Sequence, residues 1–298
     1  MRKLVAAAAL TLTLSGAAPA AVFYEPFDYA AGNLGLNVNP SVNQTWYSSA
    51  VGAGADDRVQ VSTGNLSATG LPDSVGSMAT FGGSGRTDRI FLGANRNSGS
   101  VYYSLLMKVT DLTGTGATGA TIFGFNNTPQ TALNHDTAGQ PTAISGRLLV
   151  KVIDATAGTY QIGASKSSGT AADFVFSPTA FTTNADTIFL VGRYTFNPSA
   201  GDDTFDLWVN PAPETFADDA LMPVPTLTAT TGADGGQIAT VVIRQTSAVV
   251  PAGLQFDELR VDTRWAHVTS NLVPEPASLS TLTVAAAAGT MLRRRKRA

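Results

Sequence analysis

Paired carboxylates are the first residues of this sequence that could do chemistry. Hydrolysis of a glycosidic bond needs two carboxyl groups, about 5–5.5 Å apart for retention or about 6.5–9.5 Å apart for inversion. Alternate residues of a strand share a face, so a Glu-x-Asp-x-Glu pattern would supply such a pair. No such pattern occurs, and the four glutamates, at positions 25, 214, 258 and 275, are isolated from one another. Asp257 and Glu258 are adjacent, so a regular strand would turn them to opposite faces, one ordering the strand and the other in water.

A group of aspartates offers hard oxygen ligands for a cation. Asp202, Asp203 and Asp206 lie within five positions, in a loop that leads into a strand-like segment. Ca²⁺ prefers clustered carboxylate oxygens of this kind. The alternative is that they only make turn hydrogen bonds, as aspartates in loops rich in Gly and Pro often do. These three residues are the candidate calcium site, Asp56 and Asp57 are a second candidate, and no other cofactor is indicated.

Other catalytic side chains are scarce or scattered. The chain has no cysteine, which excludes thiol nucleophiles, thiolate metal sites and disulfides. Its two histidines, His135 and His267, are too few and too scattered for a transition-metal site, although His135 lies in a long loop beside Asp136. No serine occupies a Gly-x-Ser-x-Gly pattern, and no phosphate-binding glycine loop precedes a helix. We therefore predict that the protein is not an enzyme, and we name no catalytic residue.

Two tryptophans are candidates for stacking on a sugar ring. Trp208 alternates with Phe205, Leu207 and Val209, so it lies on the opposite face of its strand. An indole there either stacks on a pyranose or packs under a loop. Trp46 lies in a segment rich in Asn and Ser that we interpret as a loop, and it is the second candidate.

Strands must position all of these residues. Period-two alternation of apolar side chains is clear over residues 101–109 and 188–196, and about a dozen segments share it. Turn signals separate them, and no long stretch has the 3.6-residue period of an amphipathic helix. The sequence therefore predicts an all-β fold of the two-sheet antiparallel sandwich type, with a closed barrel as the alternative. The long loop over residues 126–146 is a candidate binding loop.

The charge of the central segment restricts its partners. Between residues 21 and 272 there are 12 basic and 21 acidic side chains, a net charge of −9, although the whole chain carries only −3. An acidic domain repels phosphate backbones, so we predict that it does not bind nucleic acid.

Short motifs of this segment resemble a known family. Residues 256–261 (FDELRV) followed by 265–268 (WAHV) resemble the closing strand of laminin-G-like, concanavalin A-like jelly rolls. The opening FYEPFDY at 23–29 and DTFDLWVNP at 203–211 look like the same group. The resemblance implies one jelly-roll domain over residues 21–272. It implies little about activity, because a fold does not fix a function.

The first 20 residues have the pattern of a signal peptide. Arg2 and Lys3 precede an apolar run of 11 residues, which is too short to span a bilayer. Ala18 and Ala20 flank Pro19 in the small-x-small arrangement read by signal peptidase, so cleavage is expected after Ala20. Residues 1–20 are accordingly predicted to form a signal helix that is removed on export.

The last 26 residues combine three parts in a fixed order. Pro274, Glu275 and Pro276 come first, residues 278–292 are apolar, and Arg293, Arg294 and Arg295 begin a basic end that also holds Lys296 and Arg297. The apolar part would make roughly 22 Å of helix, against about 30 Å of hydrocarbon. The basic end would stay on the cytoplasmic side by the positive-inside rule. This tail, residues 273–298, resembles the PEP-CTERM sorting signal, at which a membrane-embedded exosortase processes exported proteins; an ordinary membrane anchor is the alternative.

These observations give one hypothesis and two alternatives. The hypothesis is an exported, non-catalytic protein of the cell surface or extracellular matrix that associates with polysaccharide. Its processing partners would be signal peptidase and exosortase, and its short C-terminal segment would contact the membrane, at least transiently. The alternatives are a secreted glycan-degrading hydrolase or lyase and a structural envelope protein without a ligand.

Overall fold

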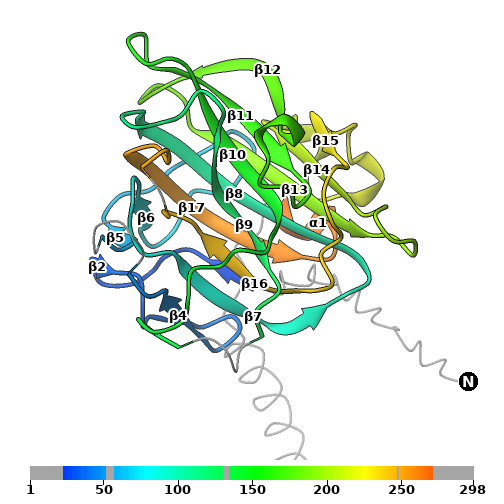
Figure 1. Ribbon diagram of the computed structural model, residues 1–298, viewed down its shortest axis with the longest axis horizontal. Coiled ribbons are helices and arrows are strands. Elements are labelled where there is room, and N and C mark those ends of the chain that lie inside the picture. Colours follow the sequence, from blue (N-terminus) through cyan, green and yellow to red (C-terminus); the bar gives the residue numbers. More distant parts are fainter. Residues whose placement is uncertain (1–22, 52–56, 130–133, 247, 271–298) are drawn as a thin grey trace, which may run out of the picture.

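Two antiparallel sheets packed face to face make up the domain. The computed structural model describes residues 23–51, 57–129, 134–246 and 248–270, and Figure 1 shows the two layers crossing the molecule. Every strand pair is antiparallel, and strands that are distant in sequence lie side by side, as β8 and β17 do. The predicted all-β jelly-roll sandwich is therefore confirmed.

The first sheet has nine strands, and its central members are long. Its order is β15 (Leu227–Ala229), β14 (Thr204–Val209), β13 (Ile188–Phe196), β8 (Gly99–Asp111), β17 (Gly253–Asp262), β6 (Met78–Phe81), β5 (Gln60–Ser62) and β2 (Gly32–Asn33), while β1 (Phe23–Glu25) pairs with β17.

The second sheet has eight strands and contains both β7 and its partner β16. Its order is β12 (Val175–Thr182), β11 (Thr159–Ser165), β10 (Ile144–Asp154), β9 (Ala120–Asn126), β16 (Ile238–Ile243), β7 (Asp88–Arg96), β4 (Gln44–Ser48) and β3 (Val38–Asn39).

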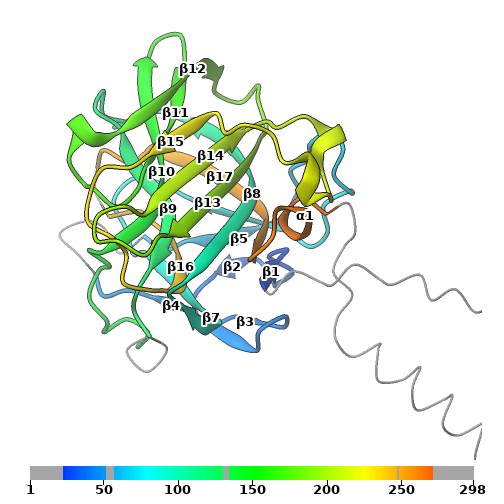
Figure 2. The same cartoon turned by 90° about the vertical axis from the view of Figure 1, so that its right-hand side faces the viewer.

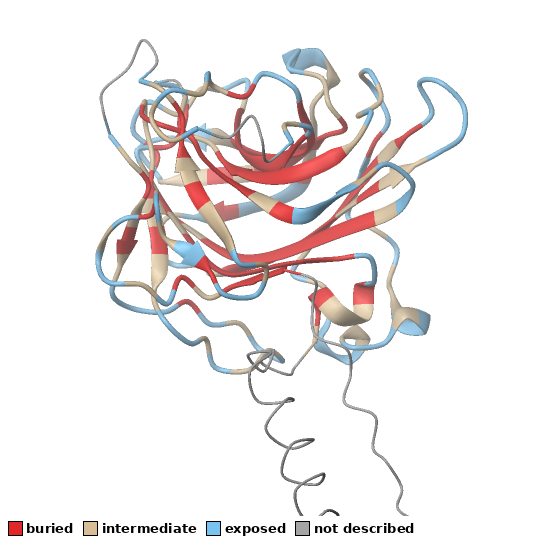
Figure 3. Ribbon diagram, turned by 90° about the horizontal axis from the view of Figure 1, so that it is seen from below, coloured by how far each residue is buried: buried red, intermediate tan, exposed pale blue. Residues whose placement is uncertain are grey.

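The main core fills the space between the sheets. Alternate residues of each strand point inward, so the apolar positions of both sheets interdigitate. Tyr103 of β8 lies at its centre, with the rings of Phe123, Phe125 and Phe205 at centroid distances of 4.9, 5.5 and 6.0 Å. Gly192 on β13 leaves room for this ring, because a Cβ there would meet the Tyr103 ring at 2.5 Å. Figure 3 shows how the buried residues follow the strands of both layers and the exposed ones follow the loops.

A second, smaller core covers part of the outer face of the nine-stranded sheet. Outward-facing Leu106, Phe189 and Trp208 pack there against residues of the short helix α1 (Trp265–Val268). Two 3₁₀ turns, Pro213–Thr215 and Asp219–Leu221, lie in the same segment of chain that supplies Phe216 and Met222 to this cluster. Figure 2 shows α1 beside β8, at one end of the sheet.

The sequence pattern missed five short or irregular strands: β2, β3, β4, β12 and β15. The segment interpreted as a loop around Trp46 is strand β4, and Pro178 lies within β12. Proline is tolerated in β12 because this strand is an edge of its sheet. The long loop after β9 is present as predicted, but it ends where β10 begins at Ile144.

Candidate functional site

A row of polar side chains crosses four strands of the nine-stranded sheet on its outer face. Gln60 of β5 lies opposite Thr80 of β6, Thr80 opposite Gln255 of β17, and Gln255 opposite Lys108 of β8. Their sequence neighbours point into the main core, so these four point outward. All four are partly exposed, and β2 extends the row with Asn33, which lies opposite Gln60.

The amide and hydroxyl members of this row, without Lys108, form the floor of a groove of about 700 Å³. The Gln60 amide donates to Asn33 Oδ1 at 2.8 Å, and the hydroxyls of Ser62 and Thr80 are 2.8 Å apart. No hydrogen bond within the described residues engages the side chain of Gln255, which lines the groove and is half-buried. Amide groups offer two donors and an acceptor, which suits them to bind sugar hydroxyls. The size and polarity of the groove fit a small carbohydrate segment.

Charged residues close one end of the groove. Arg58 lines it and forms a two-pronged ion pair with Asp136, at 2.7 and 3.0 Å. Arg86 also donates to Asp136, at 2.9 Å. Hydrogen bonds from Arg58 hold the pKa of Asp136 below its usual value against a smaller effect of burial. The buried amide of Gln245 joins this end by accepting from Gly82 N at 3.0 Å.

The groove has few groups for catalysis. Among its described lining residues Asp57 is the single carboxylate, and no histidine is present. His135 lies beside the groove end, half-buried, and its Nδ1 accepts from Ser48 N at 3.3 Å. Burial lowers its pKa, which favours the neutral imidazole. His267 is also half-buried, 2.9 Å from Asp262.

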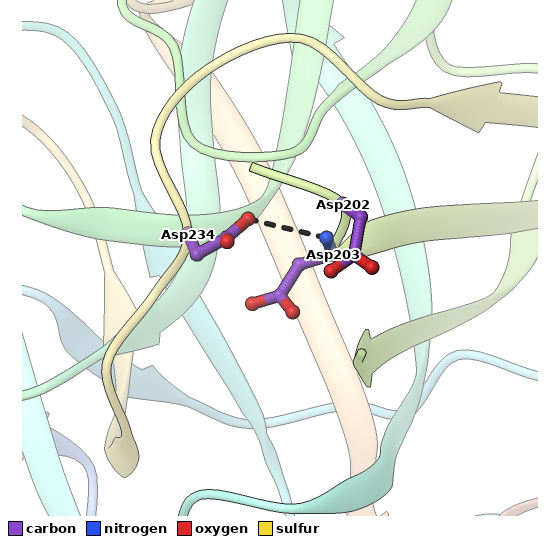
Figure 4. Close-up of side chains that lie close together, drawn as sticks. All are labelled: Asp202, Asp203 and Asp234. Carbon is purple, nitrogen blue, oxygen red and sulfur yellow. Dashed lines mark hydrogen bonds between the residues drawn. The ribbon is translucent and has the colours of Figure 1, made fainter. Parts of the chain in front are cut away.

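The aspartate loop forms an acidic cluster, but not with the predicted membership. Asp202, Asp203 and Asp234 bring one carboxylate oxygen each within 4.8 Å of the others. Figure 4 shows the three side chains close together. Asp206 is not part of it: its carboxylate lies on the outer face of β14, 2.6 Å from Arg193 Nη2 and 2.6 Å from the Thr228 hydroxyl. The prediction that Asp206 joins this site is wrong. Asp203 directly precedes β14 and Asp206 lies within it, and residues three positions apart in extended chain point to opposite faces.

A lysine already supplies a positive charge to this cluster. The Lys166 side chain is fully buried, and its Nζ donates to Asp234 Oδ1 at 2.9 Å and to Gly201 O at 3.1 Å. Burial favours a higher pKa of Asp234, but hydrogen bonds from Lys166 and from the amides of Gly201 and Asp203 hold it below its usual value. Asp203 is further engaged by the Tyr194 hydroxyl at 2.7 Å. The cluster is a closed hydrogen-bonded network in which an ammonium takes the role of a bound cation.

The two candidate tryptophans have no free ring face. Trp208 faces away from the main core as predicted, yet it is 1% exposed and packs edge-on against Trp265 at 5.1 Å. Its Nε1 donates to Pro223 O at 2.8 Å, so the segment after the 3₁₀ turns covers it. Trp46 is completely buried in β4. Of the two alternatives for Trp208, packing under a loop is therefore the one that the structure has, and Trp46 is enclosed by the core, so neither ring is free to stack on a sugar.

Glu25 explains the burial of Trp46. This fully buried carboxylate accepts from Trp46 Nε1 at 2.7 Å, Tyr29 Oη at 2.8 Å, Phe27 N at 2.8 Å and Asn39 Nδ2 at 3.0 Å. Desolvation raises its pKa, and the four hydrogen bonds oppose that rise. Because β1 and β4 belong to different sheets, Glu25 links the two layers.

Asp257 and Glu258 are both buried, which corrects the prediction that one of them is in water. Glu258 has a φ of 52°, and the pairing of β17 with β8 shifts between Asp257 and Arg260. This bulge breaks the alternation, so both carboxylates accept from the loop after β5: Asp257 from Leu66 N at 2.9 Å and Glu258 from Val75 N at 3.1 Å. Desolvation raises the pKa of Asp257 to about 8. The pair fastens this loop to β17.

The predicted processing residues cannot be placed. Ala18, Ala20, Pro274, Glu275, Pro276, Arg293, Arg294 and Arg295 all lie outside the described residues, as do Asp56 and the two predicted terminal helices. Within the described ranges, no helix has both the length and the apolar character needed to cross a membrane.

Comparisons with known proteins find similarity in solved structures alone. No family model matches the sequence, and no curated protein does. A mutant of HCR/D matches with 10% identity and a TM-score of 0.42, over 88% of this chain and 51% of that one. The receptor binding domain of botulinum neurotoxin mosaic serotype C/D matches with 11% identity and a TM-score of 0.44, over 85% and 49%. The metal-free carbohydrate recognition domain of Emp46p matches with 8% identity and a TM-score of 0.38, over 79% and 96%. The chain thus spans about half the length of the first two.

Proposed function

We propose that this is an exported, non-catalytic protein that associates with extracellular polysaccharide at the cell surface or in the matrix. The observation that carries the proposal is the groove on the nine-stranded sheet, whose floor is a continuous row of amide and hydroxyl side chains. A row of alternating donors and acceptors across several strands suits a chain of repeated hydroxyl groups better than a single compact metabolite.

The carboxylates argue against the glycan-degrading alternative. Asp257 and Glu258 are buried under a loop, and Asp234 of the acidic cluster is ion-paired with Lys166. Neither of these described groups presents two carboxyls to an open groove, which glycoside hydrolysis requires.

Binding to a panel of immobilised glycans tests the proposal. The full-length chain should bind at least one neutral polysaccharide, and Gln255→Ala should weaken that binding about tenfold without lowering the midpoint of thermal unfolding. Gln237→Ala is the matched control, since its amide bonds to Asn127 O on another part of the surface. If no glycan is bound, the structural alternative without a ligand replaces this proposal.

The route of export is a separate part of the proposal and rests on the two ends of the sequence. Signal peptidase would cut after Ala20, and exosortase would act near Pro274–Pro276 while the apolar stretch and its arginines hold the chain at the membrane. Intact mass of the protein from cell envelopes reports both cuts and any attached group. A cytosolic chain with both ends uncut would disprove this route.

A further inference from the structure

Three arginines share the outer face of the eight-stranded sheet. Arg89 lies on β7, Arg147 on β10, and Arg244 directly follows β16. Each has a sequence neighbour in the main core (Ile90, Leu148 and Ile243), so the arginines point away from it.

The strand register brings the three together. Arg89 lies opposite Val242, and Arg244 follows two residues later on the same face, a diagonal neighbour about 7–8 Å away. The backbone of Arg244 donates to Ile122 O at 2.8 Å, and Arg147 Nη1 donates to the hydroxyl of the adjacent Thr121 at 3.3 Å. The three guanidiniums therefore span β7, β16, β9 and β10.

None of the three forms an ion pair within the described residues. Arg147 donates from Nε to two carbonyls, of Ile144 at 3.0 Å and Ser167 at 3.1 Å, and Arg89 donates from Nη2 to Gly139 O at 3.0 Å. The buried Nε atoms of Arg89 and Arg244 have no hydrogen-bond partner, and Arg89 is only 3% exposed. Leaving a buried charged donor unsatisfied is costly, so an anion that accepts from it would be stabilised.

The strands of this face carry more basic than acidic side chains. Burial and, to a smaller extent, the charge of Arg244 lower the pKa of Arg147 to about 10. Lys151 adds a fourth positive charge, with its Nζ 4.1 Å from the centroid of the Phe176 ring. The strands of this sheet hold two acidic residues: Asp88, buried at the end near Arg58 and Arg86, and Asp154 in an exposed turn. The positive face therefore forms in a domain whose net charge is −9.

We propose that this arginine face binds the carboxylate groups of an acidic polysaccharide. A guanidinium presents paired N–H donors in a plane that matches a carboxylate. The half-buried ring of Phe176 offers an apolar surface next to the charges, as pyranose rings require. This site lies on the other sheet from the neutral groove, so it goes beyond the proposed function and does not depend on it.

Binding of polygalacturonate by the full-length chain tests the assignment. The double variant Arg89→Gln/Arg244→Gln should bind polygalacturonate at least tenfold more weakly. Arg244→Lys keeps the charge but loses the paired N–H donors of the guanidinium, so it should lose less affinity. Arg96→Gln, at the far end of β7, is the matched control and should bind like the unmodified chain. Affinity for a neutral glycan bound in the groove should not change in any of them, which separates this site from the groove.

Two results would overturn it. One is unchanged polygalacturonate affinity in the double variant when its thermal unfolding shows that it is folded. The other is that the unmodified chain binds single-stranded DNA or dextran sulfate as tightly as polygalacturonate at equal salt, since the face would then respond to charge and not to carboxylates.

Discussion

The two sheets share an apolar inner face but differ in what they do with the outer one. The nine-stranded sheet covers part of its outer face with a second core and carries six acidic against three basic residues in its strands. The eight-stranded sheet carries four basic against two acidic residues and leaves three arginines without carboxylates. Alternation alone therefore decides the shared core, whereas binding capacity depends on which outward residues find partners within the chain.

Glu25, which links the two sheets, should be the residue whose substitution lowers stability most. Glu25→Ala would leave four buried donors without an acceptor, at about 1–3 kcal/mol each, so we expect a loss of at least about 3 kcal/mol in the free energy of unfolding. Denaturation in urea measures it. Glu214→Ala is the control because this glutamate is exposed and should change stability by less than about 0.5 kcal/mol. An equal, small effect of both variants would mean that Glu25 does not join the layers.

The second largest loss of stability should come from replacing Lys166, the buried ammonium beside the acidic cluster. Lys166→Met removes the ammonium that pairs with Asp234 in the acidic cluster and should cost about 2–3 kcal/mol of stability, a value reduced by the partial exposure of Asp234. Millimolar Ca²⁺ should leave the unfolding temperature of the unmodified chain unchanged and should partly restore that of the variant. A clear rise for the unmodified chain would show that a metal binds despite the lysine.

Asp88 and Asp257, one in each sheet, are buried carboxyls with raised pKa values, and both should make stability depend on pH. Desolvation raises the pKa of Asp88 to about 7 and that of Asp257 to about 8, from 3.8 for both. The folded state thus holds protons that the unfolded state has lost, so stability falls as pH rises from about 4 to about 8 and then levels off. The slope should be on the order of 1 kcal/mol per pH unit for each group.

Asparagine variants separate the two contributions. Asp88→Asn should reduce the fall of stability with pH up to about pH 7, and Asp257→Asn should reduce it up to about pH 8. Urea denaturation over this pH range provides the measurement. Slopes identical to that of the unmodified chain would refute the assignment of these two groups.

The smallest effect should come from the tryptophan of the second core. Trp208→Phe loses the hydrogen bond to Pro223 O and should cost about 1 kcal/mol in the free energy of unfolding, while glycan binding stays unchanged. If the variant lost glycan binding but kept its stability, Trp208 would have to be a ligand-binding residue.

The sequence predicts the fold better than the site. Regular alternation marks β8 and β13 at once, because both have one face in the main core. The short strand β4 is not predicted because Asn and Ser surround it. Glu25, whose hydrogen bond explains why Trp46 is buried in this strand, lies 21 residues earlier in the sequence.

The site residues depend on contacts that no local pattern records. Asp234 joins Asp203 from 31 residues away, and Lys166 reaches Asp234 from a serine-rich turn. The bulge at Glu258 puts Asp257 and Glu258 on the same side of β17, although alternation alone would separate them. Likewise, the register of β5, β6 and β17 aligns Gln60, Thr80 and Gln255, although each is an ordinary polar residue in its own segment.

The buried lysine has a consequence for the setting in which such a protein would work. The ammonium of Lys166 is covalently part of the chain, so neither dilution nor a chelating polymer can remove it. Acidic gels sequester divalent ions, and a sandwich fastened by exchangeable metal would loosen inside one. This domain carries its own counter-charge, so its architecture would persist in surroundings depleted of free metal.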